Sequence, residues 1–202
     1  MALALEGLCV LDLSRVLAGP YACMVLADLG ADVVKVEMPG RGDDARAYPP
    51  YIEGESAYFM SLNRNKRSVT LDLKNPAGRR LLTNLAAKAD VLVENYRPGA
   101  MARLGLAYDD LRQTNPRLIY AAISGFGQTG PYAQRPAYDA VVQALSGLMS
   151  ITGPEGGPPT RVGTSIADVT AGLFAVIGIL AALYRRQETG VGQMVDVAML
   201  DS

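Results

Sequence analysis

Residues 8–37 read LCVLDLSRVLAGPYACMVLADLGADVVKVE and contain the pattern that decides the fold. The apolar run at residues 8–13 predicts a buried strand, and residues 21–29 have helical spacing after a turn predicted at residues 18–20. Gly30 is expected to end that helix. Residues 32–37 are rich in β-branched side chains and predict a second strand. The stretch therefore predicts a β-α-β unit.

The same alternation continues along the chain. Asn75-Pro76 is a typical helix start, because proline at the first helical position gives up no needed hydrogen-bond donor. Alternating strands and helices predict one α/β domain with a mainly parallel sheet and flanking helices. Further strands are expected at residues 68–73, 91–94 and 118–124, and helices at residues 76–88, 108–113, 138–151 and 168–186.

The amino-acid composition limits the partners and the kinds of catalytic site that are expected for this chain. Half of the 202 residues are apolar, which suits a folded domain. Lys and Arg number 19 against 20 Asp and Glu, and the formal charge of -1 favours neither nucleic acid nor anionic lipid as a partner. The chain has no histidine, which excludes an imidazole base, a Ser-His or Cys-His pair and a His-ligated metal within it. Any catalysis by this chain must therefore use carboxylates, amines, hydroxyls or backbone dipoles.

Three features bear on location. Cys9 and Cys23 lie in apolar runs without CxxC or metal-type spacing, which is typical of buried, reduced thiols in a cytoplasmic protein. The first ten residues show no secretory signal. Residues 169–184 carry no charge, but this run is shorter than the roughly 20 residues that a bilayer requires. We expect a buried helix there, and a cytoplasmic protein without a membrane partner.

Two glycine-rich stretches are weak matches to a dinucleotide-binding fingerprint. Residues 125–130 (GFGQTG) fit GxGxxG after a predicted strand, but Pro131 follows where the fingerprint needs a helix. Residues 40–45 (GRGDDA) fit the looser GxGxxA form, with two carboxylates where a phosphate would lie. A nicotinamide-dependent oxidoreductase is therefore the weaker alternative.

Cationic side chains in or beside predicted loops give a stronger anion-binding signal. Each one alone is more typical of solvated surface. The loop at residues 95–99 (NYRPG) adds an amide, an aromatic ring and a guanidinium, and the whole set suits a phosphorylated nucleotide. The set comprises residues 63–67 (NRNKR), Lys74, Arg97, Arg103 and Arg135.

Asp168 opens the most apolar predicted helix and closes the loop at residues 160–167. The plain interpretation is a helix cap, because a carboxylate at a helix start is stabilised by free N–H groups and the helix dipole. A carboxylate held there beside a glycine-containing loop is also a positioned nucleophile. The two roles are compatible, and the residues alone favour the cap.

These segments together resemble the class III coenzyme A transferases. The resemblance spans essentially the whole chain, and several ordered motifs at family-like spacing carry it. The motifs are residues 11–20 (LDLSRVLAGP), 30–37 (GADVVKVE), 63–68 (NRNKRS), 93–99 (VENYRPG), 125–131 (GFGQTGP), 138–140 (YDA) and Asp168 with its helix.

The resemblance implies a Rossmann-like sheet that forms the N-terminal part of an interlocked-dimer CoA-transferase fold. It implies that acyl-CoA and a carboxylic acid are the substrates, that no cofactor is permanently bound, and that Asp168 is the nucleophile. The positions that match the family's CoA contacts are Val16, Leu17, Leu71, Lys74, Asn95, Tyr96, Arg97, Arg103, Arg135 and Tyr138.

Within the family the chain looks most similar to the branch that uses succinyl-CoA and dicarboxylate acceptors. Residues 15–20 (RVLAGP), 146–149 (SGLM) and 151–154 (ITGP) carry this likeness. Formyl-CoA transferase has glutamine at the position of Leu17 and arginine at that of Met38, which favours succinyl-CoA over formyl-CoA. The related racemases need a histidine base, which this chain lacks.

The resemblance also implies that residues 1–202 are one large N-terminal domain, and that a C-terminal half with a glycine loop is missing. The apolar-patterned residues 192–201 reach the terminus without a stop signal, so we expect the chain to end inside an element. The alternative to a transferase is then an inactive, truncated remnant that binds CoA without turnover.

Overall fold

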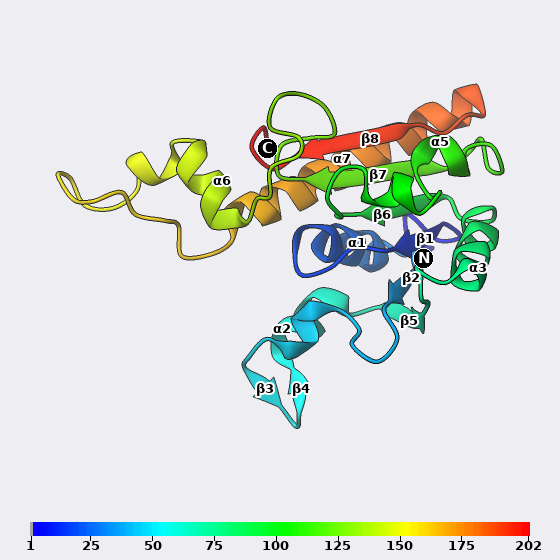
Figure 1. The fold of residues 1–202 in the computed structure, drawn as a ribbon, viewed down its shortest axis with the longest axis horizontal. Helices are drawn as coiled ribbons and strands as arrows, with labels where there is room; N and C mark the ends of the chain where they lie inside the picture. The colour runs from blue at the N-terminus through cyan, green and yellow to red at the C-terminus, as the bar shows by residue number, and fades with distance from the viewer. Residues whose placement is uncertain (1) are drawn as a thin grey trace.

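Six parallel strands form the central sheet of the computed structural model, which describes residues 2–202 (Figure 1). The predicted α/β class with a mainly parallel sheet is confirmed, and the expected strands at residues 32–37 and 91–94 have the observed bounds. The strands are β1 (Cys9–Asp12), β2 (Asp32–Glu37), β5 (Lys66–Thr70), β6 (Val91–Glu94), β7 (Ile119–Ser124) and β8 (Met194–Ala198).

The strand order is β5-β2-β1-β6-β7-β8. From β1 the chain builds outward through β2 to β5, and it then crosses to β6 and builds outward in the opposite direction. In such doubly wound sheets the loops after the two central strands diverge, and a crevice opens at the carboxyl ends of these strands. The topology therefore places a binding site after β1 and β6.

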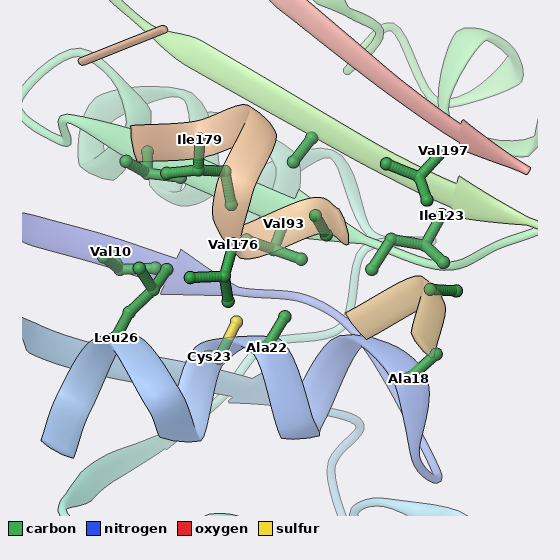
Figure 2. Packing of buried hydrophobic residues seen from close by; sticks show 14 of the residues in the cluster. Val10, Ala18, Ala22, Cys23, Leu26, Val93, Ile123, Val176, Ile179 and Val197 are labelled. Atoms are coloured by element: carbon green, nitrogen blue, oxygen red, sulfur yellow. The ribbon is translucent and has the colours of Figure 1, made fainter. Parts of the chain in front are cut away.

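Helices α1 (Ala18–Asp28) and α7 (Ile166–Thr189) cover one face of the sheet. Figure 2 shows Val10, Val93 and Ile123 of the strands meeting Ala22 and Val176 of these helices. Alternate strand residues supply this core because side chains alternate across a sheet. α7 approaches α1 closely at Gly172, where a Cβ atom would lie 2.8 Å from the Ala18 carbonyl oxygen.

The other face of the sheet is covered by three helices, α3 (Pro76–Ala86), α4 (Ala100–Arg103) and α5 (Tyr108–Leu111). Leu92 and Tyr120 of the strands lie in this second core with Leu82 of α3. Strands buried on both faces explain the continuous apolar runs in the sequence. α4 was not predicted from the sequence.

Two parts of the chain project from this body (Figure 1). The first contains η1 (Asp44–Ala47), the β3–β4 hairpin (Tyr51–Ile52 and Glu55–Ser56) and α2 (Ala57–Asn63), none of which was predicted. The second contains α6 (Asp139–Leu145), η2 (Leu148–Ser150) and the loop at residues 151–165. The single helix expected at residues 138–151 is divided because Gly147 has a left-handed φ of 83°.

Two helix starts differ from the expectation. α1 begins at Ala18, so residues 18–20 are its first turn and not a separate turn. Pro20 is tolerated because N–H groups in the first turn have no intrahelical partner.

α7 is longer than predicted and starts two residues earlier, at Ile166. It has 24 residues and a mean hydropathy of 2.2 in its most apolar window, so by length and composition it is sufficient to cross a membrane. One side of it is buried, while Phe174, Ile177 and Tyr184 on other sides are exposed.

A buried group of charges lies at the carboxyl ends of β1 and β2. Lys66 Nζ lies 2.8 Å and Lys35 Nζ 3.7 Å from Asp12 Oδ2, and Lys35 Nζ also lies 2.8 Å from Asp43 Oδ2. All four side chains are at most 2% exposed. Burial by itself raises the pKa of Asp12, but Lys35 and Lys66 reverse this effect and hold it at about 2. Asp12 therefore stays ionised and joins β1, β2 and β5.

We predict that Asp12→Asn lowers the free energy of unfolding by about 3–5 kcal/mol at neutral pH, because Lys66 loses its buried partner charge. The folded pKa of Asp12 lies below its ordinary value of 3.8, so its contribution is complete above that pH and is lost as the pH falls through about 2. Urea unfolding across this range measures both effects. The exposed Asp201→Asn is the control, and equal losses in the two variants would contradict the prediction.

Candidate functional site

Two adjoining hollows occupy the crevice that the strand order places after β1 and β6. One has a volume of about 540 Å³ and lies toward β2 and β5, and the other has a volume of about 450 Å³ and lies toward β7 and α7. Arg15, Tyr96, Ala100 and Arg103 line both of them. The hollows are thus two parts of one cleft with a shared wall, and an elongated ligand fits this shape.

Every position that the family resemblance assigned to the site lines this cleft. Leu71 and Lys74 lie in the larger hollow, while Tyr96 and Arg103 lie in the shared wall. The structure brings these residues together although they come from loops that are distant in the chain. The smaller hollow is lined by Val16, Leu17, Asn95, Arg97, Arg135, Tyr138 and Asp168.

Three cations from the predicted anion-binding set have structural contacts elsewhere. Arg64 pairs with Asp28 at 2.5 Å and Arg67 with Asp32 at 2.5 Å, both outside the cleft. Lys66 is the buried partner of Asp12 and is 2% exposed. The proposed grouping of residues 63–67 with the cleft cations is therefore wrong, because their charges are used by acidic partners on β1, β2 and α1.

Asn95 joins the loops that follow β1 and β6. Its Oδ1 accepts a hydrogen bond from the Arg15 backbone N–H at 2.8 Å, and its Nδ2 donates to the Arg15 carbonyl oxygen at 2.8 Å. The next amide, of Val16, donates to Asp43 Oδ1 at 3.0 Å. The loop after β1 is consequently held from both sides of the crevice.

Val16 has a φ of 68°, in the left-handed region that a β-branched residue rarely adopts. Such a conformation costs about 1–3 kcal/mol and persists only where the surroundings hold it. Asn95 and Asp43 supply these restraints. The turn brings the chain directly into α1, where Gly19 is required because a Cβ atom would lie 2.2 Å from Ser14 Cβ. The N-terminus of α1 is thereby directed at Asp168.

Asp168 is the third residue of α7, since the helix begins at Ile166 with Ser165 as its N-cap. The interpretation of Asp168 as the helix cap is therefore wrong. The side chain that bonds the helix start is that of Asp139, whose Oδ1 accepts from the Ala167 N–H at 2.8 Å. Asp168 is half-buried, lines the smaller hollow and still lies in the positive end of the helix dipole.

The environment of Asp168 raises its pKa to about 6. Burial is the main cause, the negative charge of Asp139 adds to it, and the Ala18 backbone amide acts in the opposite direction. Tyr58 of α2 responds to the same carboxylate, because burial and then Asp168 raise the pKa of Tyr58 to about 12. At neutral pH Asp168 is mostly ionised, and its ionised form is destabilised relative to a carboxylate in water.

Two residues that support the site, Asp139 and Gln143, were not identified from the sequence. Asp139 is 8% exposed and also accepts from Gln143 Nε2 at 2.6 Å, while Gln143 Oε1 accepts from the Val162 N–H at 2.8 Å. These bonds attach α6 and the loop before α7 to the start of α7. The motif at residues 138–140 could have identified Asp139, but only Tyr138 was assigned a role from it.

The glycine-rich stretches do not form a dinucleotide site. Residues 125–130 follow β7, and the next helix among the described residues is α6, which begins at Asp139. Gly127 lies beside Asp196, and the Gln128 N–H donates to that carboxylate at 3.0 Å. In the stretch at residues 40–45, Asp43 caps η1 and pairs with Lys35. Carboxylates therefore occupy both places where the fingerprint needs a phosphate.

A family model, curated relatives and a solved structure all match this chain over nearly its whole length. A family model described as CoA-transferase family III matches residues 5–202. An acetyl-CoA:oxalate CoA-transferase of Acetobacter aceti is 53% identical over 97% of this chain and 51% of that protein, and a succinyl-CoA:glutarate CoA-transferase of Mus musculus is 52% identical over 98% and 46%. A CaiB/BaiF family crystal structure from Brucella suis has a TM-score of 0.96 at 46% identity, covering 100% of this chain and 54% of that chain. The chain spans about half the length of these relatives.

We predict that Asp139→Asn lowers the pKa of Asp168 below its value of about 6, because the neighbouring negative charge is removed. The amide oxygen of the variant still accepts from the Ala167 N–H, so the helix start is retained. The measurement is the pH dependence of carbodiimide labelling at Asp168, read by peptide mass spectrometry. Asp109→Asn is the exposed control. An unchanged or higher midpoint in a folded Asp139 variant would show that this charge does not act on Asp168.

Proposed function

Because the chain belongs to CoA-transferase family III, we propose that its protein moves coenzyme A from an acyl-CoA to a carboxylic acid through covalent catalysis at Asp168. The observation that carries this proposal is the placement of Asp168. A half-buried carboxylate lies in a cleft between the N-termini of α1 and α7, with no histidine in the chain to serve another nucleophile. The assigned CoA contacts line the same cleft.

The first half of the reaction releases the donor acid. The Asp168 carboxylate attacks the thioester carbonyl carbon, the C–S bond breaks with its electron pair on sulfur, and a mixed anhydride and CoA thiolate result. The thiolate then attacks the Asp168 carbonyl carbon of the anhydride. The donor leaves as a carboxylate, and Asp168 becomes an aspartyl-CoA thioester.

The second half repeats these steps in reverse with the acceptor. The acceptor carboxylate attacks the aspartyl-CoA thioester, and CoA thiolate leaves again. The thiolate attacks the acceptor carbonyl of the new anhydride, which forms the product thioester and restores the Asp168 carboxylate. Each step exchanges one activated acyl bond for another, so no net proton, nucleotide hydrolysis or imidazole is needed.

The surroundings of Asp168 suit these steps. Its raised pKa indicates a carboxylate less stabilised than one in water, which favours attack on the donor. The Ala18 amide acts on the carboxylate, and the positive dipole ends of α1 and α7 favour negative charge on oxygen. The Ala18 amide is therefore the candidate oxyanion donor.

The cleft also offers groups for the nucleotide part of CoA. Lys74, Arg103, Arg97 and Arg135 provide cations for phosphates, and the Tyr96 ring lies in the wall between the two hollows.

The proposed reaction uses no metal and no resident cofactor. The proposal further includes an interlocked homodimer of the full-length protein in the cytoplasm, which sedimentation velocity and cell fractionation would test.

We predict that Asp168→Asn abolishes covalent labelling and turnover while melting stays close to that of the wild type, because an amide cannot form the anhydride. The measurement gives the full-length enzyme donor acyl-CoA without acceptor, traps the adduct with hydroxylamine and reads Asp168 by peptide mass spectrometry. Acylation should rise with pH through about 6 as Asp168 ionises.

Turnover by the folded Asn variant would exclude Asp168 as the nucleophile. A full-length wild type that binds CoA without forming any adduct would favour the second candidate, a protein that binds CoA without turnover.

We predict that succinyl-CoA is a better donor than formyl-CoA. Leu17 is apolar and lines the smaller hollow, and residues 15–20 and 151–154 resemble the succinyl-CoA branch. Relatives named for oxalate and for glutarate are almost equally similar, so the acceptor is left as a carboxylic acid. Competing-donor kinetics decide the donor, and a preference for formyl-CoA would overturn the assignment.

A further inference from the structure

Glu94 is a buried carboxyl group that none of the proposed steps uses. It is the last residue of β6, its exposed fraction is 5%, and it lines neither hollow. Leu92, two residues earlier, lies in the core under α3 and α5, so Glu94 points to the same side of the sheet. It therefore lies beneath the loop that begins at Asn95.

Glu94 contacts the Tyr96 backbone and the Tyr120 hydroxyl. Glu94 Oε2 accepts a hydrogen bond from the Tyr96 N–H at 2.7 Å, and Oε1 accepts one from the Tyr120 hydroxyl at 3.4 Å. Tyr120 is itself 2% exposed and packs against Tyr108, with ring centroids 6.1 Å apart. The Tyr96 amide is thus held by a side chain that is fixed within the core.

Tyr96 is the residue through which Glu94 affects the cleft. It lines both hollows, and the Arg15 guanidinium lies 4.7 Å from the centroid of its ring. Arg15 is in turn held by Asn95 through both of its backbone groups. A displaced Tyr96 would therefore change the wall shared by the two hollows, whereas Asp168 lines only the smaller one.

The charges around Glu94 come from several elements. Asp196 of β8 faces it, Asp110 of α5 acts on Tyr120, and Arg15, Lys35 and Asp12 act on Tyr96. Burial, and to a lesser extent Asp196, raise the pKa of Glu94 to about 7, while the bonds from Tyr96 and Tyr120 lower it. Both protonation states are thus present near neutral pH, and the ionised one makes the stronger bond to the Tyr96 amide.

We infer that Glu94 is a positioning residue that holds Tyr96 in the shared wall of the cleft and thereby controls the affinity for acyl-CoA, independently of the chemistry at Asp168. This inference rests on the proposed function for its ligand, but not for the contact itself. The substrate-binding wall is accordingly more firmly held above neutral pH than below it.

The experiment compares Glu94→Gln and Glu94→Leu with the wild type in the full-length protein. The glutamine oxygen still accepts from the Tyr96 N–H but cannot ionise, whereas leucine leaves that buried amide without its partner. We expect Glu94→Leu to raise KM for acyl-CoA and Kd for CoA about tenfold, with kcat within about threefold. Glu94→Gln should restore affinity to within about threefold and remove the pH dependence of Kd near neutrality. Exposed Glu188→Gln is the control.

A second readout does not need CoA. Amide hydrogen exchange at residues 95–99 should accelerate in Glu94→Leu and stay slow in Glu94→Gln. Unchanged exchange and unchanged Kd in the leucine variant would overturn the inference, as would a loss confined to kcat. If the wild type binds no CoA while exchange still separates the two variants, the proposed function fails and the positioning of Tyr96 by Glu94 stands.

Discussion

The side-chain amide of Asn95 bonds both backbone groups of Arg15, and these two hydrogen bonds connect the diverging loops that follow β1 and β6. The strand order opens the crevice, but it does not determine the path of the loop after β1. Asn95 from one side and Asp43 from the other hold Val16 in a left-handed conformation. α1 can then begin at Ala18, whose backbone amide acts on Asp168. The cleft and the candidate nucleophile both depend on this arrangement.

Two carboxylates of the same type show how the fold assigns different roles. Asp12 is completely buried, yet Lys35 and Lys66 keep its pKa at about 2, and its charge joins three strands. Asp168 is less buried, yet its pKa is raised to about 6, because burial and then the negative charge of Asp139 disfavour its ionised form, and no lysine among the described residues pairs with it. The first environment stabilises the ionised form and suits a structural role. The second leaves the ionised form reactive and suits covalent catalysis.

The sequence predicted much of the framework because its signals are local. Residues 32–37 and 91–94 are recognisable as strands from their β-branched and apolar side chains, and Asn75-Pro76 marks the start of α3. The sequence did not predict helix boundaries correctly where residues that favour a helix lie beside glycine or proline. Gly147 divides the helix expected at residues 138–151, and α1 begins three residues before the predicted start because Pro20 is tolerated in its first turn.

The sequence by itself determined the α/β class, the parallel sheet and the chemical inventory, because alternating patterns and a chain without histidine need no knowledge of contacts. Only the tertiary structure decided what individual polar residues do. Lys66 looked like a loop cation and is a buried partner of Asp12, and Asp168 looked like a cap although Asp139 makes that bond. These roles depend on residues 54 and 28 positions apart in the chain. A side chain's burial, charge partners and pKa are set by such distant neighbours, which no local pattern specifies.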